Sequence, residues 1–240
     1  MHRYIARLGA GFVTAIALCA VEAAATPLVS GGGTATCELG PGVGAAPHTP
    51  CALQAITAHP AWQPNNPDPA GHGAGYGGVW VSYANTGIGG DTLAPQAGSL
   101  QNPTGMAFIL DVTETFNLGG AGALDLYVWA DDTADVFLDD VAQFAANFTQ
   151  GTCAVGAIGC EPGEYFHLNS ALGAGSHTLM LRAYQTGSGT NPSANPFGLL
   201  YSGSVLQPMS RHLSVRAPDG MGLLLIGLLG LPWRRRVGLK

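Results

Sequence analysis

The chain has 240 residues, among them 36 glycines and 16 prolines, and its formal net charge is −6 at pH 7. Most of its basic residues lie at the two ends, so residues 26–215 retain only Arg182 and Arg211 against 13 acidic residues, a net charge of 2 − 13 = −11. Nucleic-acid binding relies on clustered Lys and Arg and is therefore excluded, whereas divalent cations and neutral surfaces remain as partners.

Residues 1–25 have the pattern of a secretory signal peptide. Arg3 and Arg7 precede an apolar stretch from Leu8 to Val21, and small residues follow at Ala23–Ala25. The apolar stretch is shorter than the ~20 residues that a membrane-spanning helix needs. Cys19 follows Leu18 rather than a small residue, which disfavours a lipoprotein. We predict a signal helix that is cleaved after Ala25.

Four cysteines remain after this cleavage, an even number that suits a chain exported to an oxidising compartment. They are Cys37, Cys51, Cys153 and Cys160. Three pairings are possible, and the sequence-local one, Cys37 with Cys51 and Cys153 with Cys160, is favoured because each pair closes a short loop. The spacings of 14 and 7 and the lack of a C-x-x-C motif disfavour zinc.

Short β-branched and aromatic runs between glycines and prolines predict an all-β fold, and we expect one antiparallel β-sandwich over residues 26–212. About seven strands are predicted, at residues 78–83, 105–116, 123–130, 134–139, 163–168, 177–184 and 199–206. Residues 40–78 are rich in Pro, Gly, Asn and His and are expected to be mostly loop.

Alternation assigns the strand faces, because successive side chains point to opposite sides of a sheet. Leu179, Leu181 and Ala183 are expected to face the core, with Arg182 outward. Asp111 is likewise expected on a solvent face.

The same alternation directs Leu124, Leu126 and Val128 of residues 123–130 inward. The opposite face then carries Asp125, Tyr127 and Trp129. A sugar is held by aromatic stacking together with carboxylate hydrogen bonds, so these three residues are candidate glycan ligands. Alternatively, the aromatic rings pack against an overlying segment. The residue pattern leaves both interpretations open.

The densest run of acidic residues comes at residues 131–140. Asp131, Asp132 and Asp135 are candidate ligands of a structural calcium ion, which binds six to eight oxygens. The run does not have EF-hand spacing, and a hairpin with a solvated acidic face is the alternative. No other cofactor is indicated.

Sequence motifs for hydrolysis are missing, since the chain contains neither G-x-S-x-G nor H-E-x-x-H. We therefore predict that the protein is not an enzyme. A catalytic triad is defined by geometry rather than by sequence position, so a hydrolase remains an alternative.

The C-terminal residues 213–240 combine a short polar motif, an apolar helix and a basic cluster. The motif is Ala217-Pro218-Asp219-Gly220, the 13 residues from Met221 to Trp233 are apolar residues with Gly and one Pro, and Arg234-Arg235-Arg236 follows. Such an element halts in the bilayer with its basic cluster on the cytoplasmic side.

This arrangement resembles the PEP-CTERM class of bacterial sorting signals, in a variant with Pro-Asp where the family has Pro-Glu-Pro. The resemblance implies an exosortase-type processing enzyme as partner, transient contact with the membrane, and release to the cell envelope or the exterior. A permanent C-terminal anchor is the alternative.

The body resembles the jelly-roll, galactose-binding-like domains that proteins with such a tail often carry. The matching motifs are residues 58–62, 79–82, 124–139, 175–179 and 196–199. This resemblance implies a non-catalytic cell-surface or matrix protein that binds glycan or exopolysaccharide. A purely structural surface domain without a small ligand is the second hypothesis.

Overall fold

A computed structural model of the protein describes residues 23–69, 76–95, 107–148, 158–186 and 189–208. All of them belong to the compact unit Met1–Met209. Residues 1–22 of the predicted signal peptide and the whole predicted sorting tail, including Ala217–Gly220 and Arg234–Arg236, lie outside the described residues. Within the described ranges, no helix combines the length and the apolar character required for crossing a bilayer.

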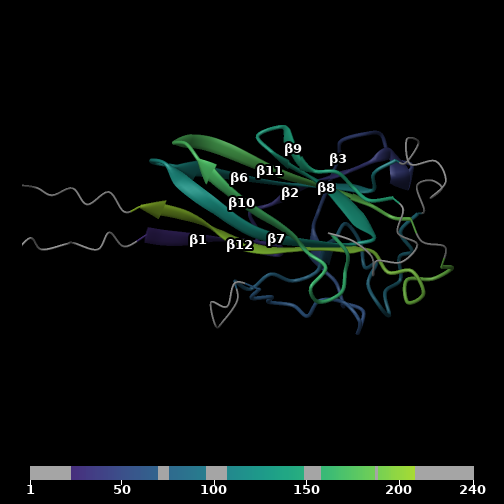
Figure 1. Ribbon diagram of the computed structural model, residues 1–240. Coiled ribbons are helices and arrows are strands. Elements are labelled where there is room, and N and C mark those ends of the chain that lie inside the picture. The colour runs from purple at the N-terminus through teal and green to yellow at the C-terminus, as the bar shows by residue number, and fades with distance from the viewer. Residues whose placement is uncertain (1–22, 70–75, 96–106, 149–157, 187–188, 209–240) are drawn as a thin grey trace, which may run out of the picture. The chain divides into compact units, whose positions relative to one another are not determined.

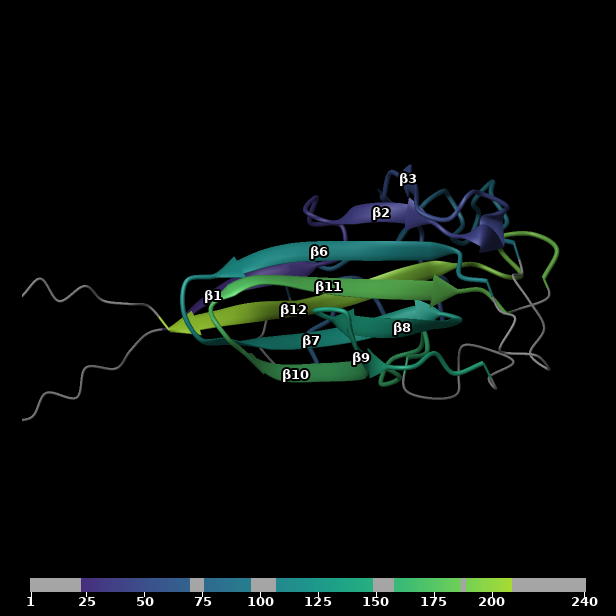
Figure 2. The ribbon, with the colours of Figure 1, turned by 90° about the horizontal axis from the view of Figure 1, so that it is seen from above.

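The described unit is a sandwich of two six-stranded sheets in which every strand pair is antiparallel, as predicted (Figures 1 and 2). Sheet A contains β10 (Phe166–Leu172), β7 (Gly122–Asp131), β12 (Gly198–Pro208), β5 (Val81–Ser82) and β4 (Gln54–Ala55) in this order, and β1 (Ala23–Val29) also pairs with β12. Sheet B has the order β3 (Thr49–Cys51), β2 (Thr36–Leu39), β6 (Leu110–Leu118), β11 (Gly175–Tyr184), β8 (Thr133–Leu138) and β9 (Val141–Phe144). A 3-10 turn, η1 (Pro41–Val43), follows β2.

The core between the sheets consists of the inward side chains of the long strands. Leu124, Leu126 and Val128 of β7 are fully buried. Leu179, Leu181 and Ala183 of β11 meet them from the other sheet and are buried as well. The predicted alternation is therefore confirmed in both strands.

Several strand boundaries differ from the predicted ones. The strand expected at residues 78–83 shortens to Val81–Ser82, because the backbone before it bonds to loops: Val79 donates to the Ser30 carbonyl, and Trp80 donates to Asn65 Oδ1. The strand expected at 163–168 lies at Phe166–Leu172. The segment 40–78 contains η1, β3 and β4, whose two or three residues are too few to show alternation.

Two acidic residues of β6 are buried, which corrects the expectation of a solvent face for Asp111. Asp111 is 1% exposed because the guanidinium of Arg182, on the neighbouring strand β11, covers it and donates from Nε (2.9 Å) and Nη2 (2.8 Å). Glu114 points into the core and accepts a hydrogen bond from the Tyr201 hydroxyl at 2.6 Å. Burial, followed by the charge of Glu114, raises the pKa of Tyr201.

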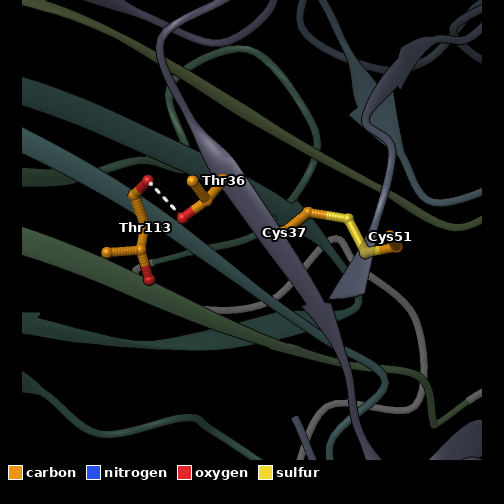
Figure 3. Close-up of a disulfide and its surroundings, with 4 residues drawn as sticks. All are labelled: Thr36, Cys37, Cys51 and Thr113. Atoms are coloured by element: carbon orange, nitrogen blue, oxygen red, sulfur yellow. Dashed lines mark hydrogen bonds between the residues drawn. A yellow bond between two sulfur atoms is a disulfide. The ribbon is translucent and has the colours of Figure 1, made fainter. Parts of the chain in front are cut away.

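A disulfide joins β2 to β3 through Cys37 and Cys51, which confirms the predicted pairing (Figure 3). Their Cα atoms are 5.2 Å apart. On the other side of β2, Thr36 Oγ1 donates to the Thr113 carbonyl of β6 at 3.3 Å. Cys160 is also disulfide-bonded, but Cys153 lies outside the described residues, so its pairing stays a prediction. A disulfide of this kind indicates an oxidising compartment.

Candidate functional site

The outer face of sheet A, which points away from sheet B, carries polar and aromatic side chains from three neighbouring strands. The strand register places Tyr127 of β7 between His167 of β10 and Ser202 of β12. Two residues earlier along β7, Asp125 lies between Asn169 and Ser204 in the same way. The two residues on each strand are two positions apart, and paired residues of neighbouring strands point to the same side. All six side chains therefore share one face of the sheet.

Half of this face lies under a segment that we call the cover, residues 56–69 and 76–80. The blue loop that follows β4 runs along the outer side of β7 and β12 in Figure 1. Trp62 and Trp80 of the cover are buried, with ring centroids 4.2 Å apart. Trp80 Nε1 donates to the Gln63 carbonyl at 2.7 Å, and Ser202 Oγ donates to the Pro67 carbonyl at 3.2 Å. The first bond joins the two parts of the cover, and the second holds the cover on the sheet.

Trp129, one of the predicted glycan ligands, lies beneath the cover. Its side chain is fully buried in a second hydrophobic cluster with Trp62, Trp80 and Leu200, and Tyr165 packs on it edge to face at 5.5 Å. A ligand would therefore reach Trp129 only by displacing the cover. The structure assigns this residue to packing, which is the alternative that the sequence left open.

The open half of the face lies beyond Tyr127, whose own side chain is still buried at 8% exposure. The His167 ring lies flat on the Tyr127 ring, with 4.3 Å between centroids and 2° between planes. His167 Nε2 donates to Asp125 Oδ1 at 2.5 Å, and the two side chains are 39% and 23% exposed. Asp125 and Tyr127 are thus brought together as predicted, with His167 as an additional member.

Tyr165 and Tyr76 border this group. Tyr165 contacts the Tyr127 ring edge to face at 5.1 Å, and the Tyr76 hydroxyl accepts a hydrogen bond from Ser204 Oγ at 3.3 Å. We define the candidate site as the set Tyr76, Asp125, Tyr127, Tyr165 and His167.

The charges that act on the candidate site are negative. The pKa of Tyr127 is raised first by burial and then by the negative charge of Asp125, with smaller contributions that include Asp68. Tyr127 therefore stays neutral and offers a hydroxyl rather than a phenolate. Chemically, the site combines stacked rings, tyrosine hydroxyls and a carboxylate, a set that holds a small ring with apolar faces and polar edges.

The acidic run at residues 131–140 does not converge on one point. Asp135 accepts hydrogen bonds from the Tyr184 hydroxyl (2.7 Å) and from the Ala146 amide (2.7 Å). Asp132 Oδ2 accepts from the amide (2.5 Å) and hydroxyl (2.8 Å) of Thr186.

Asp131 is buried, and burial together with the charge of Asp132 raises its pKa well above the ordinary value. Within the described ranges, no three His, Cys, Asp or Glu side chains form a group that could hold a metal ion. Calcium at Asp131, Asp132 and Asp135 stays a prediction.

Among the described residues, histidine–carboxylate pairs occur three times, each on a different part of the sandwich. They are His48 with Glu38 (2.7 Å), His167 with Asp125 (2.5 Å) and His177 with Asp139 (2.8 Å). In the described part of the chain, none of these histidines is hydrogen-bonded to a serine or cysteine, as a nucleophilic triad requires.

His167 and Tyr165 were not predicted as site residues. Alternation alone puts both on one face of the strand expected at residues 163–168. Their position beside Tyr127 comes from the pairing of β10 with β7, which the sequence does not reveal.

Comparison with known proteins gives structural likeness only. No protein-family model and no curated protein matches the sequence. A family 35 carbohydrate-binding module from Clostridium thermocellum is similar in structure, with a TM-score of 0.35 and 9% identity over 75% of this chain and 97% of the module. A GH26-CBM35 β-(1,4)-mannanase from Podospora anserina gives a TM-score of 0.28 and 12% identity, over 66% of this chain and 26% of the mannanase. The K3 cleaved adhesin domain of Lys-gingipain from Porphyromonas gingivalis gives a TM-score of 0.28 and 15% identity, over 62% of this chain and 90% of that domain.

Proposed function

We propose that the protein is an exported, non-catalytic module of the bacterial cell envelope or extracellular matrix that binds glycan through the candidate site. One observation carries the proposal, namely the parallel stack of the His167 ring on the Tyr127 ring. Asp125 is hydrogen-bonded to His167 at the edge of this stack, on the open half of the sheet face.

The geometry favours a sugar for a physical reason. A pyranose has apolar C–H faces and a rim of hydroxyl groups, so it stacks on rings while a neighbouring carboxylate accepts its hydrogen bonds. His167 presents a partly exposed ring, and Asp125 presents a partly exposed carboxylate beside it. Tyr76, at the start of the second part of the cover, reaches Ser204, which pairs with Asp125, and would border the bound sugar on that side.

Export and sorting are part of the same proposal. The basic lead and apolar stretch of residues 1–25 support secretion, and the motif, apolar helix and arginine cluster of residues 213–240 support processing by an exosortase-type enzyme after transient membrane contact. Strand β1 begins at Ala23, three residues before the proposed cleavage point, and cleavage there leaves Thr26–Val29 paired with Ser202–Val205.

A pair of matched histidine variants tests glycan binding. His167→Ala removes the stacked ring, whereas His48→Ala removes a histidine that also pairs with a carboxylate but lies in the turn before β3, beside sheet B. On a glycan array, the unchanged full-length chain should bind a subset of glycans, His167→Ala should lose at least about tenfold in affinity, and His48→Ala should bind as before. Equal binding by all three proteins would contradict the proposed site.

A structural surface domain without a small ligand is the second candidate function. The second hydrophobic cluster favours it, because Trp62, Trp80 and Trp129 serve packing and none of them is available to a ligand. This role would be established instead if the chain unfolds cooperatively, binds no glycan on the array and shows no heat of binding to soluble oligosaccharides.

A further inference from the structure

We infer that the candidate site takes a sugar bearing a free amine, such as the 2-amino-2-deoxyhexose units of a deacetylated polysaccharide, and discriminates against uronic acids and sulfated sugars. The inference rests on the proposed function and narrows it to a ligand class. Its basis is the charge of the described residues, combined with the partly exposed carboxylate of Asp125 in the candidate site.

The described part of the chain is almost devoid of positive charge. It contains thirteen Asp and Glu residues but a single Lys or Arg, namely Arg182. Arg182 lies on sheet B and is committed to Asp111 by two hydrogen bonds. No Lys or Arg side chain in these ranges is therefore free to bind a carboxylate or sulfate of a ligand, and the negative charge of these residues opposes the approach of an anionic glycan.

The candidate site itself supplies a partner for a cation. Asp125 accepts the His167 hydrogen bond through Oδ1, and among the described residues its Oδ2 has no hydrogen-bond partner. The carboxylate is 23% exposed, so this oxygen can be reached from solvent. Asp68 adds a second negative charge that is close enough to contribute to the raised pKa of Tyr127.

An ammonium group suits this position better than a hydroxyl group does. Both groups can donate a hydrogen bond to a carboxylate, but only the ammonium adds the attraction of its own positive charge to that bond. A sugar amine bonded to Asp125 Oδ2 would keep its ring beside His167, which is the exposed member of the stack. The aromatic contact and the charged contact would then act on one sugar residue.

The experiment compares three oligosaccharides of equal length by isothermal titration calorimetry on the full-length chain. They are a fully deacetylated chito-oligosaccharide, its fully N-acetylated counterpart and an oligogalacturonate, at a mildly acidic pH that protonates the amine. We expect the deacetylated oligomer to bind about tenfold tighter than the acetylated one, since only its amine carries a positive charge at the Asp125 carboxylate. The oligogalacturonate should show no binding.

Two isosteric variants distinguish binding of the amine at Asp125 from a general attraction of the cationic oligomer to the acidic protein. Asp125→Asn should abolish the tenfold preference for the amine. Asp140→Asn removes the same charge from the exposed turn after β8, on the other sheet, and should keep the preference. If both variants lose it equally, the attraction is non-specific and the inference is wrong.

The possible failures are distinguishable. Equal affinity for the two chito-oligosaccharides, or tighter binding of the oligogalacturonate, would overturn the amine preference while leaving glycan binding intact. Absence of binding to all three, together with an empty glycan array, would overturn the proposed function and the inference with it.

Discussion

The outer faces of the two sheets have similar sequence patterns but different structures. On sheet A, the cover buries Trp129 under Trp62 and Trp80, while the side chains of Asp125 and His167 remain partly exposed. On sheet B, a shorter segment lies over one end of the outer face, where the Ala146 amide donates to Asp135 and Phe148 packs edge to face on Tyr184. There Arg182 lies 4.2 Å above the Phe108 ring and neutralises Asp111.

The difference shows that strand alternation decides which side a residue faces, while distant segments decide whether that side is buried. Trp129 and Arg182 both point outward from central strands, yet one is core and the other is surface. Where the cover ends, the sheet presents stacked rings and a carboxylate to solvent, and this boundary is the place that the proposed function uses.

The largest effect should follow from removing a ring of the cover. Trp80→Ala deletes a fully buried side chain from the second cluster and should lower the free energy of unfolding by about 3–5 kcal/mol in urea titration. Phe137→Ala, which removes a half-buried ring from the outer face of sheet B, should cost roughly half as much or less, because less apolar area leaves water there. Equal costs would mean that the cover is not a second core.

The next effect concerns the edge of sheet B. Replacing both Cys37 and Cys51 by Ser opens a 14-residue separation and should cost about 3 kcal/mol of unfolding free energy, with tryptophan fluorescence of the folded state unchanged. Thr36→Val, beside the disulfide, should stay within about 0.5 kcal/mol. A change in folded-state fluorescence would show that the two faces are not independent.

Arg182→Met should be somewhat less costly, at about 2 kcal/mol, because it leaves the buried Asp111 carboxylate without its partner while Arg182 itself is partly exposed. The double variant Arg182→Met with Asp111→Leu should recover most of this loss in chemical unfolding. If the losses of unfolding free energy from the two substitutions add up in the double variant, each side chain stabilises the fold by more than neutralising the other.

The smallest effect is a pH dependence from His177 and Asp139. Their hydrogen bond lowers the pKa of Asp139 and raises the pKa of His177. The pair therefore stabilises the fold above the ordinary Asp value of 3.8 and below the ordinary His value of 6.5, and the contribution is lost as the pH rises through the raised His177 pKa.

The Asp139 side chain is 44% exposed, although that of His177 is only 11% exposed, so solvent screens the pair and the change should stay below about 1 kcal/mol. Unfolding midpoints measured across this pH range should decline toward alkaline pH in the unchanged protein and less so in His177→Gln. An identical decline in the variant would assign the pH dependence to other groups.

Local pattern predicted much of the fold. The inward faces of β7 and β11 and the Cys37–Cys51 bridge follow from residues that are close in sequence. The short strands β3, β4 and β5 could not be delimited, because two or three residues carry no alternation and their pairing depends on distant partners.

The site was predicted only in part, for the same reason. Asp125 and Tyr127 are on one face by alternation. His167 joins them across 42 residues of chain, and Trp129 is removed from the surface by a cover some 50 to 70 residues earlier in the sequence. The buried pair Glu114 and Tyr201, 87 residues apart, was equally beyond the reach of local patterns.

An NMR titration tests the central claim most directly. Amide resonances of the full-length chain would be followed while a soluble oligosaccharide that binds on the array is added. The account predicts saturable shifts at His167, Asn169 and Ser204 on the outer face of sheet A, with Thr113 and Met180 of sheet B unchanged. Shifts confined to sheet B, or binding without any shift around Asp125, would contradict it.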